Sequence, residues 1–355
     1  MSELVRAAVA AVVEGRTLSM DDARLAMGAV MDGEATPSQL AALLMGLRMR
    51  GETVEELAGF ASAMRERVVR VDAPVGTMDI VGTGGDGSGT FNISTTAALI
   101  VAATGVPVAK HGNRAITSRS GSADVLDALG IRIDHDAASA GRAIRELGFA
   151  FLFAPSFHPA MRHAGPTRRE IGVRTAFNLL GPLTNPAGAT RGLIGVGDEA
   201  AAPRLAEVLR MLGTERSLVV HGAGVDELPL DGSGVVYDVT AAGIERRTVD
   251  PEALGLRRAK TSALGGAEPA ANASLVEGVL RGEPGARRDV VLLNAGAALV
   301  AAGTVDSIED GIDRAALAVD AGLAVELLTA LRAERRVADA ASQAAEPGGV
   351  AGGQA

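Results

Sequence analysis

The sequence predicts an α/β protein with a small N-terminal helical domain and a larger domain in which a largely parallel sheet is flanked by helices. Two patterns support this fold class. Apolar side chains recur at helical spacing in the first part of the chain, and short β-branched runs then alternate with helical segments. The length of 355 residues and the hydrophobic content of 47% are sufficient for about two domains with a substantial core.

The helical domain is expected to span residues 1–72, with a contribution from about 165–190. Two helix starts are clear from their capping residues. Thr36 and Gln39 have the spacing of a capping box, with a proline at the first helical position between them. Thr53 and Glu56 repeat the pattern. The short connections between these helices favour a compact bundle.

The α/β domain is expected to span residues 73–335, followed by a flexible Ala-, Gly- and Ser-rich tail over 336–355. Strands are predicted at 78–81, 106–109, 149–153, 193–196 and 218–220, and helices at 92–104, 123–129 and 203–212. Loops at the carboxyl ends of parallel strands open into one crevice, which is where ligands usually bind.

Composition excludes several classes of site and partner. The absence of cysteine rules out disulfides, thiolate metal sites and a cysteine nucleophile. A net charge of -9 and an aromatic content of 2% argue against a surface that binds nucleic acid. The longest uncharged segment, 91–109, contains several polar residues and a proline, so it is interpreted as buried core and not as a membrane span. With no signal peptide pattern, we expect a cytoplasmic enzyme.

A glycine-rich loop follows the first predicted strand. Residues 82–87 read Gly-Thr-Gly-Gly-Asp-Gly, which satisfies the dinucleotide-binding pattern, but no acidic residue for a ribose appears before Asp124. The loop is therefore either a plain tight turn or a phosphate cradle. The second interpretation is favoured because Asn92, Ser94 and Thr95 stand where a helix begins, and free N–H groups there attract anions.

A basic stretch strengthens the case for an anion site. No carboxylate occurs between Gly87 and Ala123, whereas Lys110, His111 and Arg114 all lie in that interval. Such charges are often a solvated surface, but their place after a predicted strand favours a loop that binds pyrophosphate through point charge and guanidinium. The helix that Ser122 opens offers a second amino terminus for phosphate.

Acidic and remaining basic residues leave alternatives open. The adjacent carboxylates of Asp226 and Glu227 either bind magnesium or begin a helix. Arg168 either grips a carboxylate or faces solvent. Among the histidines outside the basic stretch, His135 is expected to be exposed because acidic residues flank it, and His221 to be structural.

At this point the residues resemble the anthranilate phosphoribosyltransferase family of tryptophan biosynthesis. The matching motifs keep their order over nearly the whole chain except the tail. They are Gly82-Thr-Gly-Gly-Asp86, Asn92-Ile-Ser-Thr95, Lys110-His-Gly-Asn-Arg114, Arg168-Arg-Glu-Ile-Gly172, Asn178-Leu-Leu-Gly-Pro-Leu-Thr-Asn-Pro186 and Val225-Asp-Glu-Leu228. One departure is Thr117, where many members have Ser or another small residue.

The resemblance implies a Mg²⁺-dependent transfer of phosphoribosyl from phosphoribosyl pyrophosphate (PRPP) to the amine of anthranilate, in a homodimer formed through the helical domain. By the same resemblance, anthranilate would contact Gly82, Asn113 and Arg168, and the metal would be held by Ser94, Asp226 and Glu227. Lys110 and His111 are the candidate catalytic residues. The PRPP site would comprise Gly82, Gly85, Asp86, Thr90, Asn92, Ser94, Thr95, Lys110, His111, Gly112, Asn113, Arg114, Ala115, Ile116, Thr117, Ser118 and Ser122.

Two other functions remain as alternatives. A pyrimidine nucleoside phosphorylase resembles this family in fold, but it uses free phosphate and needs no pair of carboxylates for magnesium. A non-catalytic paralogue that binds nucleic acid would need an extended basic face, which the net charge of -9 opposes. The sequence therefore favours small-molecule substrates, with neither nucleic acid nor membrane as a partner.

Overall fold

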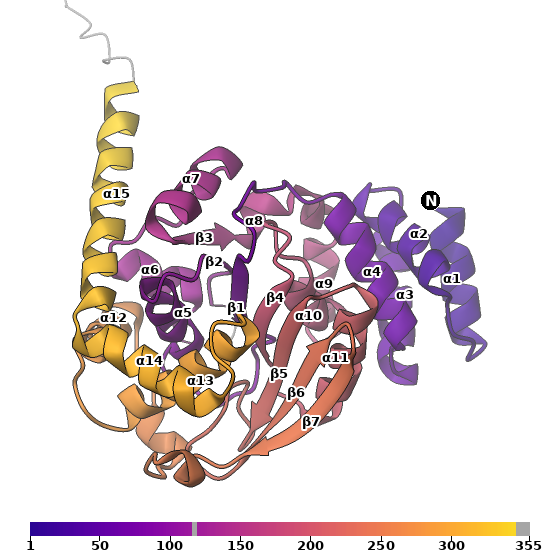
Figure 1. Ribbon diagram of the computed structural model, residues 1–355. Coiled ribbons are helices and arrows are strands. Elements are labelled where there is room, and N and C mark those ends of the chain that lie inside the picture. Colours follow the sequence, from indigo (N-terminus) through magenta and orange to yellow (C-terminus); the bar gives the residue numbers. More distant parts are fainter. Residues whose placement is uncertain (116–118, 346–355) are drawn as a thin grey trace, which may run out of the picture.

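The computed structural model describes residues 1–115 and 119–345, and its centre is one seven-stranded sheet with the order β3-β2-β1-β4-β5-β6-β7 (Figure 1). The first five strands run parallel, and the last two extend the sheet as an antiparallel hairpin. The largely parallel sheet predicted from the sequence is confirmed. The strands are β1 (Met78–Gly82), β2 (Val108–Gly112), β3 (Phe149–Phe153), β4 (Arg191–Gly195), β5 (Arg216–Gly222), β6 (Gly234–Thr240) and β7 (Gly243–Val249).

The N-terminal bundle lies beside the sheet on the right of Figure 1. Its helices are α1 (Glu3–Val13), α2 (Met20–Met31), α3 (Pro37–Arg50) and α4 (Val54–Glu66). Both predicted capping boxes are present. The hydroxyls of Thr36 and Thr53 accept from the backbone N–H groups of Gln39 and Glu56, and the side chains of Gln39 and Glu56 accept from the backbone N–H groups of the two threonines. Helices α9 (Gly165–Ile171) and α10 (Phe177–Leu180) contact α3 and α4, so this later segment packs with the bundle.

Helices cover both faces of the sheet. Side chains of α5 and α13 share one core with the residues of β1 that include Met78 and Ile80, and α7 and α11 pack on the opposite face. The remaining helices are α5 (Ile93–Ala103), α6 (Ser122–Ala128), α7 (Ala137–Leu147), α8 (Ala154–Phe157), α11 (Ala202–Met211), α12 (Pro269–Leu280), α13 (Ala286–Ala301), α14 (Ile308–Asp320) and α15 (Leu323–Ala345).

The strand order places a topological switch point between β1 and β4. From β1 the chain proceeds outward through β2 and β3, and it then returns to place β4 on the other side of β1. Gly82 and Gly195, the last residues of these two strands, are register partners. Ligands of open α/β sheets bind at this kind of switch point, beyond the carboxyl ends of the strands.

Three elements differ from the sequence prediction. Strand β2 begins and ends later than 106–109, so Lys110 and His111 belong to the strand and not to a loop. The hairpin of β6 and β7 was not predicted. Helix α15 continues to Ala345 and projects beyond the body in Figure 1, so 336–345 are helical where a flexible tail was expected. The rest of that tail, 346–355, lies outside the described residues.

Within residues 1–115 and 119–345, none of the helices combines the length and the apolar character needed to cross a bilayer.

Candidate active site

Asp226 occupies the switch point of the sheet because two glycines leave room for it. A Cβ atom on Gly82 would lie 2.2 Å from Oδ2 of Asp226, and a Cβ atom on Gly195 would lie 1.5 Å from its backbone oxygen. The backbone N–H of Gly84 donates to the same Oδ2 at 2.8 Å. The turn after β5 is thereby fixed against the ends of β1 and β4, and Glu227 follows directly.

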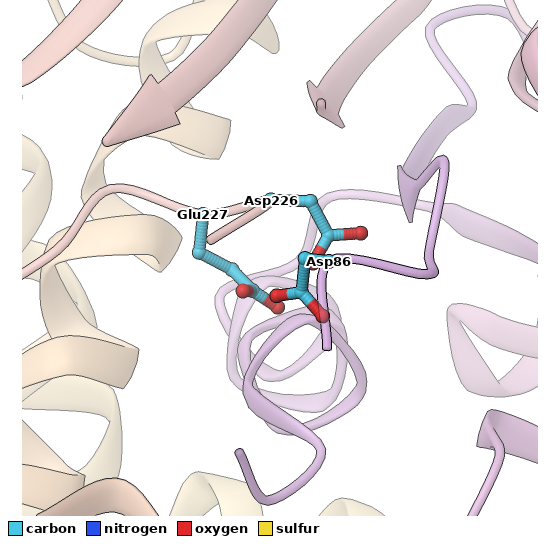
Figure 2. A group of neighbouring side chains, drawn as sticks. All are labelled: Asp86, Asp226 and Glu227. Carbon is cyan, nitrogen blue, oxygen red and sulfur yellow. The ribbon is translucent and has the colours of Figure 1, made fainter. Parts of the chain in front are cut away.

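Three carboxylates converge beside this turn. Asp86 reaches Asp226 and Glu227 from the glycine loop, and one oxygen of each lies within 4.8 Å of the others (Figure 2). Burial, together with the neighbouring acids, raises the pKa of Glu227 well above its ordinary value. Oδ2 of Asp86 and Oε2 of Glu227 are buried without a hydrogen-bond partner among the described residues. Unpaired hard oxygens of this kind fit a divalent cation such as Mg²⁺.

Lys110 lies beneath the acidic cluster, in strand β2. Its side chain is buried, and Nζ donates to the carbonyl oxygen of Ile80 at 2.5 Å. Burial lowers the pKa of Lys110 to about 8, against the opposing attraction of Asp79 and Glu227. The lysine therefore supplies positive charge from within the sheet, which differs from the loop lysine that the sequence predicted.

His111 is held as a neutral ring. Its backbone N–H donates to Oδ1 of Asp79 at 3.1 Å, and its Nδ1 lies 3.3 Å from the carbonyl oxygen of Gly181. Burial, and then the neighbouring ring of His158 at a centroid distance of 5.0 Å, lower the pKa of His111 to about 3. Nε2 is buried and has no hydrogen-bond partner among the described residues.

The buried side-chain amide of Asn185 links β1 and β2. Nδ2 of Asn185 donates to Oδ2 of Asp79 at 2.7 Å and to the carbonyl oxygen of Ala109 at 2.8 Å. Burial raises the pKa of Asp79 to about 6, although Lys110 acts in the opposite direction. Asp79 and Asn185 were not predicted as site residues. The motif that contains Asn185 was visible in the sequence, but nothing there showed its partner.

The start of α5 is positioned by a second amide. Asn92 precedes the helix, and its Nδ2 donates to the carbonyl oxygen of Ser120 while its Oδ1 accepts from Asn272. Ser94 and Thr95 lie in the first turn of the helix, where N–H groups have no partner within the helix. The predicted helix start is confirmed, and its side chains link three separate segments of the chain.

The basic stretch carries less free charge than the sequence indicated. The guanidinium of Arg114 pairs with Asp124 at 2.9 Å and with Asp127 at 3.4 Å. Asp124 also accepts from the backbone N–H groups of Ala115 and Gly121, which closes the turn. The remaining residues predicted here, Ile116, Thr117 and Ser118, lie outside the described residues.

The other predicted contacts are spread around the crevice. Gly85 belongs to the glycine loop, Thr90 forms a bridge with Gly265, and Gly112 ends β2. Asn113 follows β2, and its carbonyl oxygen accepts from the hydroxyl of Ser122 at 3.2 Å.

Arg168 is partly buried on α9, and its guanidinium lies 4.7 Å from the ring centroid of Phe177. Burial lowers its pKa, and among the described residues no carboxylate pairs with it. The side chain is therefore able to accept an anionic partner.

Two further residues depart from the sequence interpretation. His135 was expected to be exposed but has only 4% of its surface accessible, because its side chain turns inward while Asp134 and Asp136 flank it. Arg174 was not singled out, yet its Nη1 donates to the carbonyl oxygen of Gly84 at 2.5 Å and so holds the glycine loop. No periodicity or motif in the sequence indicated that contact.

The chain matches two protein families in succession. Residues 6–68 match the "Glycosyl transferase family, helical bundle domain", and residues 75–325 match the "Glycosyl transferase family, a/b domain". The anthranilate phosphoribosyltransferase of Nitrobacter hamburgensis is 50% identical over 328 residues, which cover 92% of this chain and 97% of that protein.

Solved structures agree with the sequence comparison. Anthranilate phosphoribosyltransferase from Thermus thermophilus has 48% identity and a TM-score of 0.88, with coverage of 93% of this chain and 99% of that one. The enzyme from Saccharomyces cerevisiae in complex with PRPP and Mg has 26% identity and a TM-score of 0.87, with coverage of 95% and 99%. These matches confirm the resemblance seen in the motifs: the chain belongs to the anthranilate phosphoribosyltransferase family.

Proposed function

We propose that this protein transfers the phosphoribosyl group of PRPP to the amine of anthranilate and releases pyrophosphate. The observation that supports this most directly is the convergence of Asp86, Asp226 and Glu227 beside the glycine loop and the amino end of α5. One face of the crevice offers backbone N–H groups for phosphate, and the other offers carboxylates for its counter-ion. A binding module without catalysis would not require this pairing.

PRPP is proposed to lie across the glycine loop, the first turn of α5 and the end of β2. Its phosphates would meet the loop and helix N–H groups near Asp86, Ser94 and Thr95, with Lys110 adding positive charge from below. The further contacts proposed are Gly82, Gly85, Thr90, Asn92, His111, Gly112, Asn113, Arg114, Ala115, Ile116, Thr117, Ser118 and Ser122.

Mg²⁺ is proposed to be held by Asp226 and Glu227, with Ser94 contributing directly or through water. The unpartnered buried oxygens of Asp86 and Glu227 support this assignment, as does the yeast relative solved with PRPP and Mg. When bound, the ion would offset negative charge on the departing pyrophosphate. It would also relieve the repulsion among the three neighbouring carboxyl groups.

Anthranilate is proposed to place its carboxylate against Arg168 and its ring near Asn113 and Gly82. The guanidinium of Arg168 has no acidic partner among the described residues, and a planar fork matches a carboxylate. The neutral ring of His111 would orient the attacking amine through Nε2. Rate enhancement would then come from alignment in a dry crevice and from electrostatic stabilisation of the leaving group.

Loss of anthranilate fluorescence on mixing with PRPP and Mg²⁺ tests the reaction directly. The double variant Asp226→Asn, Glu227→Gln should need far more Mg²⁺, or should fail to turn over at any concentration. Unchanged magnesium dependence would contradict the metal assignment. Turnover of a pyrimidine nucleoside with free phosphate, without loss of anthranilate fluorescence, would contradict the transferase assignment.

We also propose that residues 1–72, with about 165–190, form one domain and that 73–335 form the second. Closure about the segments 71–76 and 178–185 would exclude water from the crevice. In this proposal the helical domain also forms a homodimer contact. Exposed apolar side chains on its helices support this, among them Val13 at 75% and Met49 at 84% accessibility.

Sedimentation of the protein and of a Val13→Glu, Met49→Glu variant would test the dimer. We expect the variant to sediment as a monomer with unchanged helical content. A wild-type protein that is monomeric at micromolar concentration would refute the dimer contact.

A further inference from the structure

A cavity of about 260 Å³ lies at the edge of the sheet opposite the acidic cluster. Its walls include Gly192 and Ser217 at the amino ends of β4 and β5, the connection 185–190, and Arg65 in the last turn of α4. The acidic cluster follows the carboxyl ends of β1 and β5, so this cavity is a separate feature. It lies where the helical bundle meets the sheet.

Arg65 is a cation in the wall of this cavity that forms no ion pair among the described residues. Its Nε donates to the carbonyl oxygen of Leu183 at 2.6 Å, which anchors the side chain. Burial lowers the pKa of Arg65, and among the described residues no carboxylate forms an ion pair with it. A desolvated cation without a counter-ion is costly, so an anion bound beside it would gain the uncompensated attraction.

Two of the neighbouring charges in the cavity are already paired, and a third, that of Arg70, is exposed. Arg191 binds Glu215 at 2.9 Å, and the carboxyl group of Asp79 accepts from Asn185 and lies near Lys110. The guanidinium of Arg65 is thus the partly buried cation that is available to a ligand in the cavity.

The remaining walls define the rest of the ligand. Val68, Ile194, Leu209 and Leu212 supply apolar surface. The hydroxyl of Thr214 donates to the carbonyl oxygen of Thr190 and lies 2.7 Å from the hydroxyl of Ser217, so the two groups offer little to a ligand. The partly buried guanidinium of Arg65 beside these apolar side chains suits a singly charged group on an apolar body.

We propose that this cavity binds a small organic monocarboxylate, with the carboxylate on Arg65 and an apolar body against the β4–β5 side. Such a ligand would join α4 of the bundle to the sheet at the segment about which the two domains are proposed to close. It would lie behind the Asp79–Asn185 pair, whose other side supports His111. Occupancy would therefore act on the active crevice from a distinct site.

Calorimetric titration with cyclohexanecarboxylate tests the proposal, and cyclohexanecarboxamide is the neutral control. This probe has no planar ring or amine. We expect the acid to bind the wild-type protein and the amide to bind at least about tenfold more weakly. The Arg65→Met variant should lose at least about tenfold in affinity for the acid. Ala189→Phe, which fills the cavity without altering Arg65, should also abolish binding, and it serves if Arg65→Met does not fold.

Arg168→Met is the matched control, because Arg168 is another partly buried arginine without an acidic partner among residues 1–115 and 119–345. It should leave binding of the probe unchanged. Binding that is lost in Arg168→Met but kept in Arg65→Met would place the probe in the proposed anthranilate pocket and overturn the inference. Absence of binding to the wild-type protein at about 10 mM would also overturn it. Both outcomes are independent of whether the protein turns over PRPP.

Discussion

Replacing Gly82 with Ala should displace one carboxylate of the acidic cluster with little other change. The new Cβ atom would lie 2.2 Å from Oδ2 of Asp226, whereas a carbon–oxygen contact needs about 3.3 Å. The Asp226 carboxylate must therefore retreat by about 1 Å. Since the obstacle is a side chain and not backbone, the strands keep their register.

Two consequences follow from that retreat. The hydrogen bond from the Gly84 N–H to Oδ2, now 2.8 Å, would stretch beyond hydrogen-bonding distance. Its loss should lower the free energy of unfolding by about 1–2 kcal/mol. A displacement of about 1 Å in a group that positions reactants can cost on the order of 10²-fold in rate, so we expect kcat/KM to fall by about that factor.

Urea unfolding and magnesium titration of the anthranilate fluorescence assay measure the two effects separately. Gly192→Ala in β4 is a suitable control, because its Cβ atom would lie 3.2 Å from the nearest atom, the oxygen of Asp79. The control should keep its magnesium requirement. A Gly82→Ala enzyme with wild-type kcat/KM and wild-type magnesium dependence would refute the idea that the space beside Gly82 positions Asp226.

Three further changes have defined outcomes. Burial lowers the pKa of His135 to about 4 from 6.5, so the stability contributed by its neutral form is complete above pH 6.5 and is lost as pH falls toward 4. In urea unfolding, the free energy of unfolding of His135→Gln relative to that of wild type should therefore rise by about 3 kcal/mol between pH 7 and pH 4. Parallel pH profiles of the two proteins would contradict this. Asn185→Leu leaves the Asp79 carboxyl and the Ala109 oxygen without their donor, so thermal or urea unfolding should show a loss of about 2–4 kcal/mol, and a loss below about 0.5 kcal/mol would refute the role of this amide. Glu227→Gln should stabilise the metal-free protein by about 1 kcal/mol because it removes repulsion between Glu227 and the two neighbouring carboxyls, and should also abolish the rise in melting temperature on adding Mg²⁺; a retained rise would count against this ligand.

The sequence was sufficient for the fold class because that class depends on local patterns. Alternation of strand and helix runs predicted the parallel sheet, and capping residues located the starts of α3 and α4. Strand β2 was placed too early because Lys110 and His111 look like loop residues. They lie within the sheet because Asp79, on the adjacent strand, compensates for their burial.

The antiparallel hairpin was missed for a different reason. Strand β7 lies at the edge of the sheet and carries the mostly exposed charged run Glu245-Arg246-Arg247, which has no apolar signature. Charged residues on an edge strand protect it from pairing with another chain. The charged run that makes β7 hard to recognise in the sequence therefore also protects the edge of the sheet. The valine-rich segment 235–239 was the available signal for β6.

The acidic cluster shows most clearly what a linear sequence lacks. The adjacent pair Asp226 and Glu227 was visible, but the third carboxylate comes from Asp86, and their meeting depends on β1 and β4 being neighbours at the switch point. No spacing rule encodes that adjacency. It is a property of the strand order.

The same geometry gives Gly82, at the start of the glycine loop, a second structural role. From the sequence, its glycines were assigned to close approach of phosphate. In the structure, the first of them, Gly82, has no side chain because Asp226 occupies that space, and Gly195 serves the same purpose for the Asp226 backbone. The glycine loop and the acidic pair are therefore one structural unit, although more than a hundred residues separate them in the sequence. Substitution of either glycine should therefore displace the carboxylates first and affect phosphate binding only through that displacement.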